Sequence, residues 1–306
     1  MGERNISIGV CAEADRRAAL GLVLRSLPAD QRGPLVESLG RLQGEPLGAF
    51  AALVVARQAD RVVGATWAQP QPGRTASLWL PEVDGVRADR VSGPLIREAM
   101  QRADAAGVRL SQVLLESPQD PATPDLQANG FTLLTTLHYL QWLGDSPKST
   151  PAAESCGVEF VAAESIGRTQ LETLVGQTYT DTLDCPELDG MRSIADVLSG
   201  YEQTGDHDPA LWFVLRQADE PAGVLLLNEH RSSRQVELTY MGVVPSARGR
   251  GIGAAAVTAA QKEAARLKAD RLVLAVDDRN LPARKVYQHA GFKPWATRTV
   301  YIRPAP

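Results

Sequence analysis

The residues with the clearest chemical potential form a glycine-rich turn between an apolar stretch and an alanine-rich one. The turn reads Val244-Pro-Ser-Ala-Arg-Gly-Arg-Gly-Ile-Gly253. Glycines let backbone N–H groups approach a ligand without a Cβ in the way, and the start of the following helix adds unpaired N–H donors and a positive dipole end. The turn therefore predicts a pyrophosphate site, with Arg248 and Arg250 as additional positive charge.

This turn resembles the signature of the GNAT acyltransferase superfamily, which is Arg or Gln, two residues, Gly, one residue, and then Gly or Ala. The chain has Arg248, Gly251 and Gly253 at those positions, and Val243 and Pro245 before them also suit the family. The resemblance covers roughly residues 158 to 303. It implies transfer of an acetyl or short acyl group from acetyl-CoA, or a close relative, to an amine, with no metal.

The resemblance also implies which residues bind the co-substrate. In such enzymes the amides of the turn hold the pyrophosphate of coenzyme A, and the end of the preceding strand pairs with the pantetheine arm through backbone hydrogen bonds. The residues that this assigns to cofactor binding are Met241, Val243, Val244, Arg248, Gly249, Arg250, Gly251, Ile252, Gly253 and Asn280.

Tyr287 is the candidate acid of the reaction. It lies seven residues after Asn280, about two helical turns, so the two side chains share one helix face. The family's usual arrangement is similar: an asparagine contacts the coenzyme A arm and a tyrosine lies near the thioether sulfur. A hydroxyl there can protonate the departing thiolate. The alternative is a buried tyrosine that only packs its ring.

Glu237 is the candidate general base, because an amine must lose a proton before it attacks. Some histone-type members of the family carry this glutamate eleven residues before the arginine of the turn, which is the position of Glu237 relative to Arg248. In an apolar strand a glutamate can face a cleft and have a raised pKa, and strict alternation places it on the same face as Met241. A solvent-facing glutamate, with water as the base, is the alternative.

The acceptor is expected to meet the early helices of the second half, where residues 177–186 combine a tyrosine, hydroxyls, two carboxylates and a thiol. Asp181 or Asp184 could bind a cationic amine, or these residues could be helix caps and loop contacts. Cys185 has no evident histidine partner, which disfavours a covalent acyl-cysteine route. His230 is expected in a surface hairpin turn.

Two other functions compete with an acyltransferase. A non-catalytic acyl-CoA sensor or scaffold would use the same turn, but the pairing of Asn280 with Tyr287 favours catalysis. Gly249, Gly251 and Ala254 also satisfy a dinucleotide fingerprint. However, four residues separate the strand from Gly249, and the fifteen residues after Gly291 are too few for the further strand–helix units of that fold.

The elements that must position these residues can be read from periodicity. Strands are expected at 211–216, 222–228 and 235–244, separated by turn signals. A helix with apolar spacing follows from Ile252, then a buried strand at 271–276 plausibly parallel to the one before the helix, and a short helix that begins near Pro282 and ends at Gly291. The fold class is a mixed α/β (α+β) sheet flanked by helices.

The first half of the chain repeats this pattern at a shift of 161 residues, which indicates two tandem GNAT-like domains. A polar linker at 144–155 separates them. We expect a degenerate, non-catalytic domain at 1–146 and the acyltransferase at 157–306, because Arg90 and Ser92 stand where the second domain has signature glycines. Gln119 replaces Asn280, and Leu126 replaces Tyr287.

Composition excludes several classes of function. The chain has 306 residues, 44% of them apolar, and a net charge of −4 without a basic run, so neither nucleic acid nor a membrane is an expected partner. Three scattered cysteines and four histidines show no disulfide or metal-ligand spacing, which is typical of reduced thiols in a cytoplasmic protein. The expected partner is a small-molecule or peptide amine, and the oligomeric state is left open.

Overall fold

The structure is a computed structural model that describes residues 6–27, 32, 35, 36, 39, 48–85, 88–144 and 156–306. Its contacts divide the chain into two compact units. Unit 1 comprises Met1–Leu134 and Val300–Pro306, and unit 2 comprises Thr135–Thr299. Both divisions fall inside strands, β6 (Thr132–Trp142) and β12 (Lys293–Pro304). The predicted domain limits at 146 and 157 stay a prediction, because all but the first residue of the expected linker lies outside the described residues.

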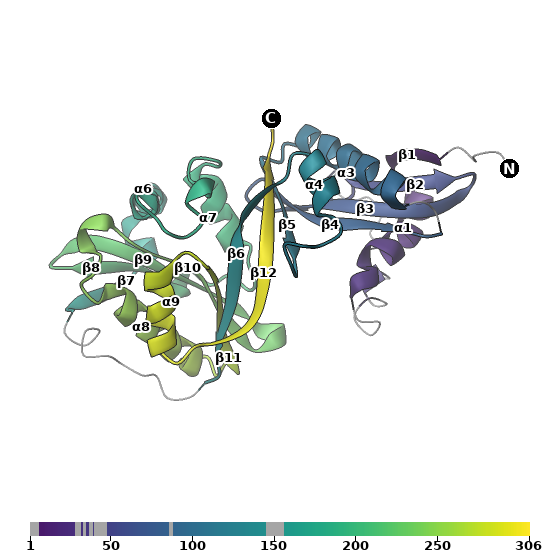
Figure 1. The fold of residues 1–306 in the computed structure, drawn as a ribbon. Helices are drawn as coiled ribbons and strands as arrows, with labels where there is room; N and C mark the ends of the chain where they lie inside the picture. The colour runs from purple at the N-terminus through teal and green to yellow at the C-terminus, as the bar shows by residue number, and fades with distance from the viewer. Residues whose placement is uncertain are drawn as a thin grey trace. The chain divides into compact units, whose positions relative to one another are not determined.

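Unit 1 is a mixed sheet with helices on both faces (Figure 1). Its further strands are β1 (Ile6–Val10), β2 (Leu53–Gln58), β3 (Arg61–Gln71), β4 (Thr75–Val83) and β5 (Leu110–Leu115), and its helices are α1 (Arg16–Val23), α3 (Ala88–Ala105) and α4 (Thr123–Ala128). They are ordered β1-β2-β3-β4-β5, with the last part of β12 beside β5. Alternate residues of β2 join different cores: Val54 packs with α3, and Leu53 packs with α1, as the period of two requires.

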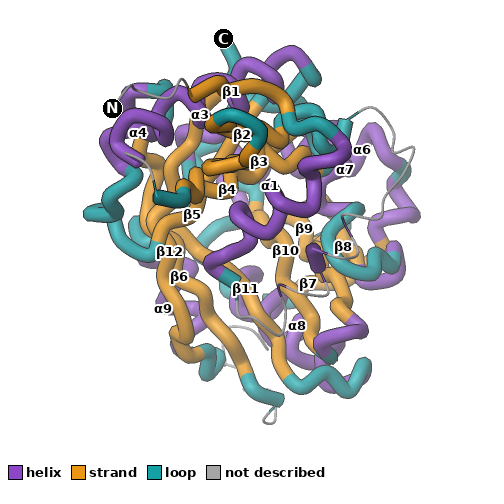
Figure 2. The backbone as a smooth tube through the Cα atoms, turned by 90° about the vertical axis from the view of Figure 1, so that its right-hand side faces the viewer, coloured by secondary structure: helices purple, strands orange, loops and turns teal. Residues whose placement is uncertain are grey.

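Unit 2 is a second mixed sheet. Its strands besides β6 and β12 are β7 (Val158–Ala162), β8 (Trp212–Gln217), β9 (Glu220–His230), β10 (Gln235–Val243) and β11 (Arg271–Asp277), and its helices are α6 (Arg168–Tyr179), α7 (Ile194–Glu202), α8 (Ile252–Arg266) and α9 (Leu281–His289). The order is β12-β6-β11-β10-β9-β8-β7, with the strands in orange in Figure 2. Helices α6 and α7 lie on one side of the sheet, and α8 and α9 on the other (Figure 1).

The expected elements of the second half are confirmed. Strands β8, β9 and β10 form the predicted antiparallel meander, and β10 and β11 are parallel across the α8 crossover. Pro282 lies in the first turn of α9, and Gly291 follows its C-terminal end with a φ of +87°, which is a conformation that glycine adopts without steric cost. Alanines on α8 allow close packing on the sheet: Ala256 and Ala260 are fully buried.

The internal repeat is visible in the strand pairing. In unit 1 the parallel pair of β4 and β5 begins with Thr75 opposite Leu110, and in unit 2 that of β10 and β11 begins with Gln235 opposite Arg271. These positions correspond at shifts of 160 and 161 residues. Each unit therefore contains the same strand–helix–strand–helix ending. None of the helices in the described part of the chain combines the length and apolar character that a membrane crossing needs.

Candidate acyl-CoA and acceptor site

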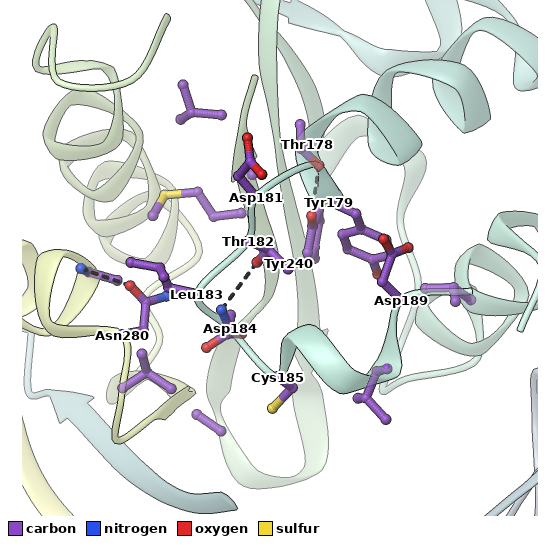
Figure 3. A pocket seen from close by; sticks show the side chains of 18 of the residues that line it. Thr178, Tyr179, Asp181, Thr182, Leu183, Asp184, Cys185, Asp189, Tyr240 and Asn280 are labelled. Atoms are coloured by element: carbon purple, nitrogen blue, oxygen red, sulfur yellow. Dashed lines mark hydrogen bonds between the residues drawn. The ribbon is translucent and has the colours of Figure 1, made fainter. Parts of the chain in front are cut away.

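The candidate site is a cavity of about 540 Å³ within unit 2 (Figure 3). Strands β10 and β11 pair only from Gln235–Glu237 to Arg271–Val273, and the cavity lies beyond the point where their pairing ends. Its walls come from β10 (Leu238–Val243), the end of β11 (Ala275 and Val276), the turn (Arg248 and Gly249), α9 with its cap (Asn280, Pro282, Ala283 and Tyr287), and residues of the segment 178–201 between and within α6 and α7.

A β-bulge at Thr239 accompanies the divergence of the strands. The pairing of β10 with β9 shifts by one residue between Leu238 and Tyr240, and an extra residue of this kind bends a strand and increases its twist. Beyond Glu237, the side of β10 that faces β11 has no ladder partner in the described ranges. The main chain from Thr239 to Val243 therefore offers an extended edge to a ligand that can pair with it.

The bulge also changes which side chains of β10 share a face, because alternation is interrupted at Thr239. Glu237 lies opposite Asn228, and Tyr240 lies opposite Leu226, so these two share a face. Leu238 and Met241 lie opposite Leu227 and Leu225 and share the other face. The expectation that Glu237 and Met241 lie on one face is therefore wrong, because simple alternation assumes a regular strand.

The glycine turn has the backbone shape that an anion site needs. Gly249 and Gly251 have φ angles of +75° and +84°, and Gly251 is the N-cap of α8. A Cβ built at Gly249 or Gly253 would meet no atom within 4 Å, so open space lies in front of both residues. The N–H groups of the first turn of α8 have no partner within that helix and can bind a phosphate.

Arg248 has a structural role in addition to its predicted one. Its guanidinium donates to the carbonyl oxygens of Val243 at 3.0 Å and Asp181 at 2.9 Å. It also donates to those of Thr178 at 3.0 Å and Thr180 at 2.7 Å. These contacts fasten the C-terminal end of α6, where carbonyls lack helical partners, to the end of β10. Direct contact of Arg248 with phosphate stays a prediction.

The other predicted cofactor residues divide into two groups. Met241, Val243, Arg248, Gly249 and Asn280 line the cavity. Val244, Arg250, Gly251, Ile252 and Gly253 continue along the turn beyond the cavity wall, where Arg250 is exposed and donates to Gln217 Oε1 at 3.4 Å. The predicted cofactor residues thus form one wall of the cavity and the glycine turn that adjoins it.

Asn280 and Tyr287 both line the cavity, as their shared helix face predicts. The Asn280 side chain caps α9 by accepting the Ala283 N–H at 3.2 Å. Tyr287 is 6% exposed. Burial, and then the charge of Asp184, raise its pKa above the ordinary value for tyrosine, so its phenol is protonated at neutral pH.

Glu237 lies where the β10–β11 pairing ends. It is opposite Val273 in the last parallel pair, and the cavity lining begins at the next residue, Leu238. Its Oε2 is 2.8 Å from His230 Nε2 at the end of β9. The sequence did not predict this pair, because it depends on the register of the β9–β10 hairpin. A role for Glu237 as base stays a prediction.

A buried carboxylate, Asp277, ties the segment after α6 to the end of β11. Asp277 is 0% exposed and accepts the Cys185 N–H at 3.0 Å and the Thr135 hydroxyl at 2.7 Å. Burial alone raises its pKa, but hydrogen bonds led by those of Arg279 and Thr135 outweigh this and lower the pKa to about 2. Arg279 also forms a two-point ion pair with Glu187, at 2.6 and 2.9 Å. Sequence reasoning missed this cluster.

Three tyrosines from separate elements meet at the cavity wall. The ring of Tyr240 stacks on Tyr201 at 5.6 Å and meets the edge of Tyr179 at 5.5 Å. The Thr178 hydroxyl donates to the Val175 carbonyl at 2.7 Å. Its contact with Tyr240 Oη, also 2.7 Å, must therefore have the tyrosine as donor, since a threonine has one hydroxyl proton. The remaining lone pairs of Tyr240 Oη are left to accept from a ligand.

Comparisons of sequence and of fold both find similarity to GNAT acetyltransferases. Residues 177–292 match the Acetyltransferase (GNAT) family. Over 299 residues, the chain is 26% identical to a mycothiol acetyltransferase of Thermobispora bispora, and the match covers 94% of this chain and 96% of that protein. A mycothiol acetyltransferase of Beutenbergia cavernae is 33% identical over 100 residues, which are 32% of this chain and 33% of that protein.

Solved structures extend the likeness of the fold to the whole chain. A GCN5-related N-acetyltransferase from Sphaerobacter thermophilus has a TM-score of 0.61 at 16% identity, and the match covers 98% of this chain and 96% of that one. A tandem GNAT protein from the clavulanic acid biosynthesis pathway has a TM-score of 0.51 at 15% identity, with 99% of each chain covered.

Together these findings identify an acetyl-CoA-dependent acetyltransferase that carries a GNAT domain at 177–292. The predicted fold, two GNAT-like domains in tandem, is confirmed. This tandem arrangement resembles that of mycothiol synthase. In the described part of the chain, no group of three or more His, Cys, Asp and Glu residues is placed to hold a metal ion.

Proposed function

We propose that unit 2 transfers an acetyl group from acetyl-CoA to the amine of a small-molecule acceptor by direct attack. The observation that carries this proposal is the continuity of three features. A glycine turn at the start of α8 adjoins the open edge of β10, and that edge shares its cavity with the buried phenol of Tyr287. This order, phosphate site, then extended edge, then proton donor, matches the order of groups along an acyl-CoA.

The chain's own main chain would hold the co-substrate. The open space in front of Gly249 and Gly253 leaves room for a pyrophosphate to accept from the N–H groups of the turn. The unpaired edge of β10 from Met241 to Val243 suits the amide groups of the pantetheine arm. Asn280, at the cap of α9, would contact that arm where it passes toward Tyr287.

The side chains of Tyr287 and Glu237 would donate and accept the protons of the reaction. As the amine nitrogen bonds to the carbonyl carbon of the thioester, the bond to sulfur breaks and Tyr287 donates its proton to the thiolate. Glu237, or water at the end of the β10–β11 pairing, accepts a proton from the nitrogen. Holding the two reactants in one cavity supplies the proximity that a bimolecular reaction in solution lacks.

The choice of acceptors to test rests on the residues that line the cavity and on the names of two relatives. The cavity is lined by tyrosines, threonines and aspartates, which suits a polar amine of modest size. Two relatives are named mycothiol acetyltransferases, so the amine precursor of mycothiol is the first acceptor to test. Ethanolamine, putrescine and glucosamine complete a panel of simpler primary amines.

The test is a thiol-release assay with this panel, combined with calorimetric titration of coenzyme A. Tyr287→Phe keeps the ring and removes the hydroxyl, so we expect kcat to fall about 100-fold or more with little change in coenzyme A affinity. Tyr301→Phe, at a tyrosine that is 3% exposed in the core of unit 1, is the matched control and should keep full activity. A wild-type chain that binds no coenzyme A would overturn the proposal.

We further infer that unit 1 has lost its cofactor site. Helix α3 begins at Ala88 and therefore contains Arg90 and Ser92, whereas in unit 2 the equivalents of those residues are the cap glycine and the second residue of α8. Ser92 thus lies beyond the first turn of α3, where backbone N–H groups bond within the helix, and not at an open helix start as Gly253 does. Leu126, at the position of Tyr287, is fully buried. Calorimetry should find one coenzyme A site per chain, and two would contradict the inference.

A further inference from the structure

Asp184 is one of three carboxylates that line the cavity, the others being Asp181 and Asp189. It lies in the segment between α6 and α7, is exposed to the cavity, and is labelled in Figure 3. Protein surrounds it on the sides that do not face the cavity, and this loss of bulk water is the main reason why its pKa is raised. Asp184 thus combines access to a ligand with an environment that strengthens electrostatic interactions.

The position of Asp184 is fixed from two directions. Its Oδ1 accepts the Asp277 N–H at 2.9 Å, and the Asn280 side chain also hydrogen-bonds to its carboxyl group. The next residue, Cys185, is held by Asp277 and has a φ of +48°, which is a strained conformation for a residue with a Cβ. The carboxylate is therefore held in place before a ligand arrives.

The charge of Asp184 acts on groups from several elements. Burial is the largest cause of the raised pKa values of Tyr287 on α9, Tyr240 on β10 and Tyr179 on α6, and the charge of Asp184 adds to it in each case. Arg279, whose charge also acts on Asp184, bonds to Asp277 and Glu187. An ammonium group of the acceptor would find a favourable negative charge at this place in the cavity.

We propose that Asp184 binds the ammonium group of the acceptor and takes its first proton, a role that rests on the acetyl transfer proposed above. The proton passes from nitrogen to the carboxylate, which frees the nitrogen lone pair for the bond to the carbonyl carbon. The C–S bond then breaks, its electron pair goes to sulfur, and Tyr287 supplies the proton of the thiol.

The remaining protons balance. The second proton leaves the nitrogen as the amide forms, by way of Glu237 or water, and restores the phenol of Tyr287. Asp184 returns its proton to solvent. One ammonium and one thioester thus yield one amide, one thiol and one released proton.

The experiment compares Asp184→Asn with Asp184→Glu in the full chain, using the fastest amine of the four-amine panel. Asparagine keeps the Oδ1 acceptor for the Asp277 N–H but loses the charge. We expect kcat/KM for the amine to fall about 10- to 150-fold, the effect of losing one charge-assisted hydrogen bond, while coenzyme A affinity changes less than about twofold. Asp184→Glu, which keeps the charge, should recover part of the loss. Asp60→Asn, in the exposed turn between β2 and β3, is the control and should match the wild type.

A pH profile distinguishes this role from a merely structural one. The titratable or charged groups around Asp184 are Tyr179, Asp181, Cys185, Asp189, Arg192, Tyr240, Asp277, Arg279 and Tyr287. Because Asp184 must be ionised to take the proton, the wild-type kcat should fall as pH drops through its raised pKa, and Asp184→Asn should lose this acid limb. Asp181→Asn and Asp189→Asn, at the other carboxylates of the cavity lining, should keep it.

The outcomes separate this proposal from the general function. Wild-type turnover together with an Asp184→Asn variant that keeps its kcat/KM within twofold and its acid limb would overturn the role of Asp184 alone. If Asp184→Asn does not fold, Asp184→Ser takes its place, and a folded Asp184→Ser variant that keeps the acid limb and a kcat/KM within twofold of the wild type would do the same. Absence of coenzyme A binding or thiol release in the wild type would overturn the acetyl transfer itself.

Discussion

Gly242, near the end of β10, has so little space that a single methyl group should disturb the cavity wall. A Cβ built there would lie 2.5 Å from Thr178 Oγ1, 2.6 Å from Thr178 Cβ and 2.8 Å from Tyr240 Oη. Carbon atoms in ordinary contact are about 3.5–4 Å apart. Gly242→Ala therefore requires α6 and β10 to separate by roughly 1 Å, because rotation of the Thr178 side chain leaves its Cβ in place.

The free-energy cost of Gly242→Ala depends on how firmly Thr178 is held against β10. Arg248 binds the Thr178 carbonyl, and the hydroxyl of Thr178 bonds to Val175 and Tyr240, so α6 cannot move without weakening these bonds. Overpacking of this kind costs about 1–3 kcal/mol. For a domain of this size, 1 kcal/mol lowers Tm by about 2–4 °C, so Gly242→Ala should lower Tm by about 2–12 °C.

The assay is thermal unfolding followed by circular dichroism, with thiol release measured below the transition. Gly253→Ala is the matched control: its Cβ meets no atom within 4 Å, and alanine in a helix is favoured over glycine by up to about 1 kcal/mol, so its Tm should stay level or rise. Gly242→Ala should also raise KM for the amine, since Thr178 and Tyr240 line the cavity. A Tm for Gly242→Ala within about 1 °C of the wild type would refute the close approach of α6 and β10.

Three further predictions concern the contacts that hold the site. The pKa of Asp277 is lowered to about 2 in the folded chain, so its contribution to stability is present above the ordinary value near 3.8 and is lost as pH falls through about 2. The free energy of unfolding of Asp277→Asn, measured over the same acid range, should lack this loss. Arg248→Lys should lower stability by about 1–2 kcal/mol in denaturant unfolding, since one ammonium cannot replace a guanidinium that serves four carbonyls; an unchanged midpoint would contradict this. Glu187→Gln should change stability by less than about 1 kcal/mol, because its ion pair with Arg279 is exposed, and a larger loss in the same experiment would count against that reasoning.

The sequence alone determined the parts of this protein that depend on local chain geometry. Glycines at 249 and 251 predicted a turn that leads into a helix, and the structure has that turn, with left-handed backbone at both glycines, at the N-cap of α8. The spacing of Asn280 and Tyr287 predicted a shared helix face, and both line one cavity. These inferences hold because each depends on a single secondary-structure element and on its residue period.

Tertiary structure decided which groups meet and which face they occupy. The bulge at Thr239 moved Glu237 away from the face of Met241, and no residue type at that position signals a bulge. The bond between Asp184 and the Asp277 N–H joins residues that are 93 positions apart, and Arg248 reaches α6 over a similar separation. Such contacts depend on how helices are placed on a sheet, which local periodicity does not encode. The turn and its helix could therefore be predicted from the sequence, whereas the choice of Asp184 over Asp181 rests on contacts that exist only in the folded chain.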